Sequence, residues 1–392
     1  MSHLLSVLHQ AGSTTLDGAS YGYNFAGNRT SKTNYLNGIT SNYGYDAIYE
    51  LQQVTQGTST TESYSYDAVG NRLSSLGMNP YSYNTSNELT ATPSGSYTYD
   101  NNGNTLSDPS GKSYTWDFEN RLVQAVVPGT GTVAFKYDPF GRRSQKSSPL
   151  GTTNYLYDGD NLVEELDGNA NAVAKYTQGL GIDEPFSMLR SGAASYYTAD
   201  ALGSITTLTS SGGSVANTYI YDSFGRLTAS TGTLTNPFQY TGRDYDPESG
   251  ERYYRARYFD PNVGRFVSED PIRFYGGTNF YRYVRNNPVR YIDRFGLEDL
   301  PDACTLCHFF CKLRFAMLTG VNTTWYFGRG LFAGWSMGPA DGPMINLFVP
   351  IDDPVSVMHD RQETKEQCRR GDLDCHQQCS AKCGVPSPPF PF

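Results

Sequence analysis

The sequence predicts a mainly β fold, in which short antiparallel strands form a long twisted sheet, followed by a small cysteine-containing helical domain. Tyr and Gly are abundant, with 31 and 40 of the 392 residues, and aromatic residues make up 14% against 18% charged. This composition favours strands joined by tight turns, so an all-α enzyme is excluded. All seven Cys lie between Cys304 and Cys383, which indicates that two unlike segments join near residue 297.

A repeated unit runs through residues 1–235. It reads aromatic-x-aromatic-Asp, then a Gly/Asn turn and an Arg-Leu-like ending, and it is clearest at 65–73 (SYDAVGNRL), 137–142 (YDPFGR) and 221–227 (YDSFGRL). Weaker copies centre on Tyr23, Tyr45, Tyr83, Tyr99, Trp116, Tyr157 and Tyr197. Successive centres are 16 to 22 residues apart up to Tyr157, and the next gap is 40. Each unit is therefore expected to be one hairpin, and the long gap about two units.

The repeated tyrosine and aspartate are expected to have a structural role. An isolated hairpin is marginal in water, so each unit needs neighbours that bury its aromatic stripe. Alternating aromatics place that stripe on one face of each strand, and Asp with Gly-Asn turns the chain. Catalysis or carbohydrate binding is the alternative, but a residue pair repeated about ten times is typical of packing.

These units resemble the tyrosine-aspartate repeats of RHS proteins and of the C components of insecticidal toxin complexes. The resemblance is most specific at GRDYDPESG (242–250), YYRARYFDP (253–261), GRFVSEDP (264–271), NNP (286–288) and DRFGL (293–297). This block, assigned to 236–297, is similar to the RHS core domain. The resemblance implies a sheet that spirals into a shell or partial shell around a C-terminal toxin. It also implies a core that cuts its own chain just after the Gly-Leu.

Self-cleavage by paired carboxylates requires two Asp so close that one stays protonated while the other activates water. The resemblance implies that two of Asp246, Asp270 and Asp293 form this pair. It also implies that Arg265 orients them. The bond that is cut would join Leu297 to Glu298. The sequence departs from the family pattern at Arg294, where proline is usual, and at Glu269, where arginine is frequent. The alternative is that these Asp are turn residues.

The segment 298–385 is expected to be a small helical domain of variable toxin type. Three Cys and following apolar residues fit one amphipathic helix at 304–318, and a glycine loop follows at 325–334. Acidic caps predict a second helix at 353–369, and a third is expected from Asp372 onward, with Cys375 and Cys379 on one face. The Pro-rich end, 386–392, is expected to be disordered.

Four interpretations of this domain are possible, and the first three are a zinc site, a nuclease and an inactive module. A zinc site is suggested by Cys304 and Cys307 with Cys375 and Cys379, but such cysteines suit disulfides between helices equally, and finger-type spacing is absent. A nuclease normally has a basic surface, whereas residues 298–392 hold 11 acidic and 8 basic side chains. An inactive module is the third.

The fourth interpretation starts from the glycine loop and a His-Asp pair. Carbonyls of a tight glycine loop plus one carboxylate suit Ca²⁺, and a neighbouring His can deprotonate water. Residues 326–330 (YFGRG) resemble the calcium loop of secreted phospholipases A2, and 353–360 (DPVSVMHD) resemble their His-Asp helix. Phe327 and Ser356 stand where that family has the two halves of one disulfide.

This second resemblance implies a calcium-dependent hydrolase of the phospholipid sn-2 ester, with a phospholipid membrane surface as its substrate. His359 would be the general base, and Asp374, or else Asp372, would hold its tautomer. The ligands of Ca²⁺ would be the Asp360 carboxylate and the carbonyls of Tyr326, Gly328 and Gly330. The ion would polarise the ester and stabilise the oxyanion.

Charge and hydropathy bear on partners and location. The formal charge of −9 gives no electrostatic support for general phosphate binding, so no nucleic-acid partner is expected. No stretch approaches a membrane span, and residues 1–12 lack the features of a secretion signal, so export would use a separate secretion apparatus. The sequence predicts a secreted or cell-surface RHS-type toxin of bacterial origin with a cognate immunity protein. The alternative is a non-enzymatic shell protein with a variable interaction tail, or a toxin of another activity.

Overall fold

The structure is a computed structural model that describes residues 3–297 and four short strands within 323–358. The chain divides into two compact units, residues 1–299 and 300–392. The first unit is mainly antiparallel β, as the sequence predicts, and its sheets follow one another along the chain.

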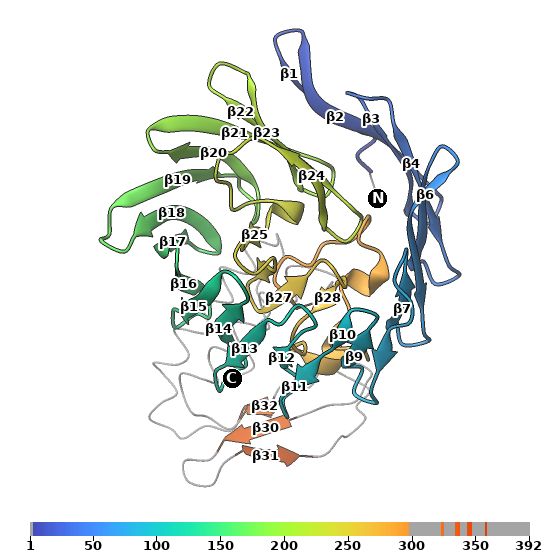
Figure 1. The fold of residues 1–392 in the computed structure, drawn as a ribbon, viewed down its shortest axis with the longest axis vertical. Helices are drawn as coiled ribbons and strands as arrows, with labels where there is room; N and C mark the ends of the chain where they lie inside the picture. The colour runs from blue at the N-terminus through green and yellow to red at the C-terminus, as the bar shows by residue number, and fades with distance from the viewer. Residues whose placement is uncertain (1–2, 298–322, 325–333, 338–342, 347–356, 359–392) are drawn as a thin grey trace. The chain divides into compact units, whose positions relative to one another are not determined.

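Three sheets contain the repeats, and in each the strands pair in chain order (Figure 1). The first has seven strands: β1 (Ser6–Ala11), β2 (Thr14–Tyr23), β3 (Arg29–Asn34), β4 (Thr40–Tyr45), β5 (Leu51–Gln56), β6 (Ser59–Tyr66) and β7 (Arg72–Ser75). The second has three: β8 (Ser82–Tyr83), β9 (Leu89–Thr92) and β10 (Gly95–Ser96). The third has fourteen: β11 (Thr98–Tyr99), β12 (Thr105–Ser107), β13 (Ser113–Trp116), β14 (Leu122–Val127), β15 (Gly131–Tyr137), β16 (Arg143–Ser148), β17 (Gly151–Asp158), β18 (Asn161–Asp167), β19 (Ala172–Gln178), β20 (Pro185–Arg190), β21 (Ala193–Ala199), β22 (Ile205–Ser210), β23 (Val215–Tyr221) and β24 (Leu227–Thr231).

The residue that follows the bulge before each repeated turn, usually the tyrosine of the Tyr-Asp pair and here called the anchor, ties its hairpin to the preceding one. The Tyr66 hydroxyl donates to the main-chain oxygen of Leu51 at 2.9 Å. The same bond, at 2.5 to 3.1 Å, joins Tyr45 to Arg29, Tyr83 to Arg72, Tyr99 to Leu89, Tyr137 to Leu122, Tyr157 to Arg143 and Tyr221 to Ile205. A β-bulge directly before the anchor, as between Ser65 and Tyr66, re-aims the side chain. In these seven bonds the acceptor lies six residues after the previous anchor.

The repeated aspartate closes the turn of its own hairpin. The Asp67 carboxylate accepts hydrogen bonds from the amides of Val69 and Asn71, at 3.0 and 2.8 Å. Gly70 has φ +82, a conformation that glycine adopts without steric cost. The Tyr-Asp pair therefore has the structural role expected from its repetition, since Tyr links hairpins and Asp shapes the turn.

The long gap after Tyr157 contains two units whose anchors are not aromatic. Gln178 follows a bulge and donates its side-chain amide to the main-chain oxygen of Leu162 at 2.8 Å. Ala199 follows the next bulge, and Asp200 behind it closes the turn. The sequence analysis centred one unit on Tyr197, but the anchor of that unit is Ala199, two residues later, because Tyr197 lies before the bulge.

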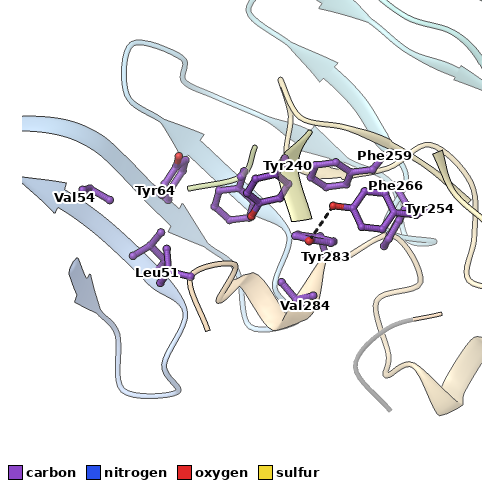
Figure 2. Close-up of a cluster of buried hydrophobic side chains, with 11 residues drawn as sticks. Leu51, Val54, Tyr64, Tyr240, Tyr254, Phe259, Phe266, Tyr283 and Val284 are labelled. Atoms are coloured by element: carbon purple, nitrogen blue, oxygen red, sulfur yellow. Dashed lines mark hydrogen bonds between the residues drawn. The ribbon is translucent and has the colours of Figure 1, made fainter. Parts of the chain in front are cut away.

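Residues 236–297 form the core block against which the repeats pack, and they belong to the same unit. The block contains the 3₁₀ turns η1 (Tyr240–Gly242), η2 (Arg273–Tyr275) and η3 (Val284–Asn286), and the sheet β25 (Asp244–Tyr245), β26 (Arg252–Tyr254), β27 (Arg257–Asp260) and β28 (Arg265–Phe266). Figure 2 shows its aromatic cluster: Tyr240, Tyr254, Phe259, Phe266 and Tyr283 pack with Leu51, Val54 and Tyr64 of the first sheet. Three further clusters join Phe238, Tyr258 and Val263 to the other strands.

The two ends of the repeat tract also meet through side chains. Lys32 of β3 pairs with Asp200 at 3.0 Å, and the Glu62 carboxylate accepts the amide of Ser223 at 3.1 Å. The first and third sheets are therefore joined both directly and through the block, which Figure 1 shows between them.

The described residues of the second unit form two antiparallel pairs. β29 (Thr323–Thr324) pairs with β32 (Val357–Met358), and β30 (Gly334–Met337) pairs with β31 (Pro343–Asn346). The predicted helix at 353–369 is wrong at Val357 and Met358, because capping signals are local and pairing with a distant strand overrides them. The other predicted helices and 386–392 lie outside the described residues. Among the residues described, no helix has the length and apolar character needed to cross a bilayer.

We expect Tyr66→Phe to destabilise the first unit by about 1 to 2 kcal/mol, because it leaves the buried Leu51 carbonyl without its donor. Tyr196→Phe is the matched control, since the Tyr196 side chain on β21 is 47% exposed. Urea unfolding of both variants measures the difference. Equal stability of the two would show that the anchor bond contributes nothing beyond ring packing.

Candidate functional site

The segment 293–297 is held by the two-residue turn between β26 and β27. Three consecutive carbonyls of the segment accept hydrogen bonds from the turn and from the first residue of β27. Arg255 donates through Nη1 to Arg294 O, the Ala256 amide donates to Phe295 O at 3.1 Å, and Arg257 donates through Nε to Gly296 O. The main chain that leads to Leu297 is therefore fixed residue by residue.

Two buried carboxylates meet on one arginine beside this segment. The Arg257 Nη2 atom lies 2.9 Å from Asp270 Oδ2 and 3.2 Å from Asp293 Oδ2, and all three side chains are 1% exposed. Asp293 Oδ1 also accepts the amides of Phe295 and Leu297, at 3.2 and 3.0 Å. One member of the carboxylate pair, Asp293, is thus bonded directly to the amide of Leu297, the residue whose peptide bond to Glu298 is expected to be cut.

The two carboxyl groups have different surroundings. Burial raises the pKa of Asp270 to about 6; Arg257 opposes this rise and Asp293 adds to it. Asp270 accepts one amide bond, from Ile272 at 3.0 Å, whereas Asp293 accepts two amide bonds and one from Arg257. Asp270 is therefore suited to hold a proton, whereas both oxygens of Asp293 accept hydrogen bonds from the folded chain.

Gly296 allows the segment to approach the β26–β27 turn closely. Its φ is +69, and an added Cβ would lie 2.3 Å from the main-chain oxygen of Tyr254 and 3.0 Å from the amide nitrogen of Arg257. Only glycine fits at that position. The Leu297 side chain that follows is 4% exposed.

The structure places the other two predicted site residues elsewhere. Asp246 is buried against β16, where its carboxylate pairs with Arg143 and, at 3.0 Å, with Lys146. Burial alone would raise the pKa of Asp246, but these two cations hold it below its ordinary value. Arg265 donates to the main-chain oxygen of Asn87 and lies over the ring of Tyr281. The residue that joins the carboxylates is Arg257, which the sequence analysis did not single out.

One feature of the sequence could have pointed to Arg257. It lies between aromatic residues in a stretch that reads as a buried strand, and a buried arginine needs an anionic partner. The Arg257 guanidinium stacks on the Phe266 ring at 3.5 Å, so both its charge and its flat face are satisfied.

The predicted lipase residues lie outside the described residues: His359, Asp372, Asp374, Asp360, Tyr326, Gly328 and Gly330. Within the part of the chain that the structure describes, no group of three or more His, Cys, Asp or Glu side chains is arranged to hold a metal ion.

Hairpins linked by anchors and packed on one core block define a YD-repeat shell protein. Residues 10–289 match the family model described as Teneurin YD-shell. The chain belongs to this family, and its repeats are of the RHS/YD type that the sequence predicts.

Several known proteins are similar to this chain. It is 35% identical over 268 residues to the tRNA3(Ser)-specific nuclease WapA of Bacillus spizizenii, a match covering 64% of this chain and 11% of the relative. It is 27% identical over 325 residues to double-stranded DNA deaminase toxin A of Burkholderia cenocepacia, covering 71% and 22%. The crystal structure of TcdB2-TccC3-Cdc42 shares the fold with a TM-score of 0.60 at 21% identity, over 72% of this chain and 17% of that one. The chain thus spans only a small part of these proteins.

We expect Gly296→Ala to destabilise the first unit more than Gly250→Ala does. Both glycines have positive φ, +69 and +84, so alanine strains either backbone by about 1 to 2 kcal/mol. At residue 250 nothing lies within 4 Å of the added Cβ, whereas at 296 it meets main-chain atoms. Thermal unfolding compares the two variants, and equal losses of Tm would contradict the close fit of 293–297 on the turn.

Proposed function

We propose that this chain is the carrier of an RHS-type polymorphic toxin that cuts its own chain after Leu297 and releases the following segment as the effector. One observation carries the proposal: Asp270 and Asp293 share Arg257 in a buried site, and Asp293 binds the amide of Leu297. Family membership supports the carrier role, and the names of the relatives, which include a toxin, support the toxin role.

The proposed reaction is hydrolysis by the carboxylate pair. Asp293 takes a proton from a water molecule whose oxygen bonds to the carbonyl carbon of Leu297. Protonated Asp270 gives its proton to the Glu298 nitrogen as the C–N bond breaks. Leu297 then ends in a carboxyl group and Glu298 in an amine, and passage of one proton from Asp293 to Asp270 restores the pair. Bonds from residues 255–257 hold the three carbonyls before Leu297 and so help to orient the attacked group, and correct orientation lowers the barrier of such a reaction.

For the released effector we propose the calcium-dependent phospholipid hydrolase that the second resemblance implies. His359 would act as base, supported by Asp374 or Asp372, with Ca²⁺ on Asp360, Tyr326, Gly328 and Gly330. A second candidate is an effector that acts on nucleic acid, which the names of the nuclease and the deaminase favour. This second candidate runs against the expectation of no nucleic-acid partner.

A released toxin also requires protection and transport. We propose a cognate immunity protein in the producing cell, and delivery by a secretion apparatus to the cell surface or the medium. The toxin relatives support this setting.

Self-cleavage is tested by Asp270→Asn and Asp293→Asn, each of which should abolish the fragment that begins at Glu298. Asp246→Asn is the matched control, since Asp246 is an equally buried aspartate of the same block that pairs with Arg143 instead. Mass spectrometry identifies the fragment after uncut, urea-denatured chain is diluted into native buffer. An uncut wild-type chain would refute the proposal, and loss of cutting in folded Asp246→Asn would add Asp246 to the site.

The same refolding experiment, repeated at several pH values, reports the protonation state of Asp270. Because the reaction needs Asp270 protonated and its pKa is about 6, the cutting rate should fall as pH rises through about 6. Because the pKa of Asp270 is higher in the folded chain than in the unfolded chain, folding is accompanied by uptake of a proton. The free energy of unfolding that Asp270 contributes is therefore largest at low pH and decreases as the pH rises toward about 6.

The effector candidates are separated by assaying the full chain on phospholipid vesicles, tRNA and duplex DNA. The lipase proposal expects release of fatty acid that requires Ca²⁺ and is lost in His359→Ala, while His376→Ala serves as the matched control in the same segment. Asp374→Asn and Asp372→Asn then show which carboxylate supports the histidine. Activity on nucleic acid alone would replace the lipase with the second candidate.

A further inference from the structure

Asp183 is a buried carboxylate that links the repeat sheet to the core block. It lies in the loop between β19 and β20, with its side chain 8% exposed. Arg243 Nη1 donates to Asp183 Oδ1, and Arg255 reaches both carboxylate oxygens, at 2.7 and 3.1 Å. Burial raises the pKa of Asp183, but Arg243 and Arg255 outweigh this effect and hold the pKa below its ordinary value.

The two arginines that pair with Asp183 contact β26 and the segment 293–297. Arg243 donates to the main-chain oxygen of Tyr253 through Nε at 3.1 Å and through Nη2 at 2.7 Å. Arg255 is the first residue of the 255–256 turn, and its Nη1 atom donates to Arg294 O. One carboxylate of the repeat sheet thus orients a contact on β26 and a contact on the segment 293–297.

The backbone on both sides of this contact is strained. Asp183 has φ +64 and Arg255 has φ +59, in the left-handed region that residues other than glycine rarely adopt. Such conformations persist only where surrounding contacts fix them, and they are common at functional sites. The η1 turn also lies tightly against Asp183, since a Cβ at Gly242 would be 2.6 Å from the Asp183 main-chain oxygen.

The same loop holds the residue that replaces the family's usual proline. Arg294 donates through Nη1 to the main-chain oxygen of Ile182 at 3.3 Å. Arg294 is therefore held at two points: its carbonyl accepts a hydrogen bond from Arg255, and its side chain donates one to the carbonyl of Ile182.

We propose that Asp183 is a positioning residue for self-cleavage: by holding Arg255 and Arg243 from the repeat sheet, it keeps the segment 293–297 in the cutting geometry. This inference rests on the proposed function. It implies that cutting awaits the closure of the β19–β20 hairpin on the core block, so that an effector is not released from a carrier that has not yet folded.

The test compares the cutting rates of Asp183→Asn and Glu165→Gln with that of the wild type, in the full chain refolded from urea. Glu165 is the matched control because its side chain is also 8% exposed and paired with one arginine, Arg190, in the same sheet. Asp183→Asn should cut at least tenfold more slowly, since small displacements of reacting groups cost about a hundredfold. Its pH profile should keep the wild-type midpoint, because Asp270 is unchanged. Glu165→Gln should cut within twofold of the wild-type rate.

The inference would be overturned if Asp183→Asn cut at the wild-type rate. It would also be overturned if Asp183→Asn and Glu165→Gln were slowed equally, because equal slowing reflects a general loss of sheet stability. Amide hydrogen exchange at Phe295 and Leu297 gives a second measurement that does not require cutting. Asp183→Asn should speed exchange at both amides, and Glu165→Gln should not. If the wild type itself stays uncut, the proposed reaction fails, and unchanged exchange in Asp183→Asn would then also refute the link between Asp183 and the segment.

Discussion

The hydrogen bond from anchor side chains to the preceding hairpin is the constraint on which the repeat tract depends. Neighbouring strands share ladder bonds, but a ladder alone permits slippage, whereas a side-chain donor aimed at one carbonyl fixes the spacing between units. Gln178 and Trp116 show that the donor matters more than the ring hydroxyl, because an amide and an indole N–H make the same bond. Burial raises the pKa of Tyr66, so the hydroxyl keeps its proton and remains a donor.

Units aligned in this way present aromatic side chains to the core block, which packs against them in four clusters. The block also contains buried arginines: Arg243, Arg252 and Arg257 are all less than 2% exposed. Buried charges of this kind add little net stability, but they specify geometry because each requires its own partner. Arg257 has two carboxylates, two main-chain carbonyls and one aromatic ring as partners. Its position therefore determines where Asp270, Asp293 and Gly296 lie.

The repeat was predictable from the sequence because it is local: Tyr, Asp and Gly perform their roles within one hairpin and its neighbour. Gln178 was missed as an anchor because an aromatic pattern does not detect an amide that makes the same bond. The carboxylate pair was predictable in part, since motif positions supplied Asp270 and Asp293. Their partner was not, because the choice between Arg257 and Arg265 depends on the pairing of β27 with β28, which directs Arg265 toward Asn87. Asp183 lies 60 residues before Arg243 and carries no motif.

Arg294 shows how a contact between distant segments can replace a local restraint. Proline at this position would fix φ and remove an amide donor whatever the rest of the chain does. Arginine leaves the backbone free, so the order of 293–297 comes from contacts that the folded unit supplies: Arg255 on the carbonyl and Ile182 on the side chain. Because both contacts depend on the β19–β20 loop, the proposed cutting geometry requires the third sheet to be packed on the block. A proline would have preset part of that geometry in the unfolded chain.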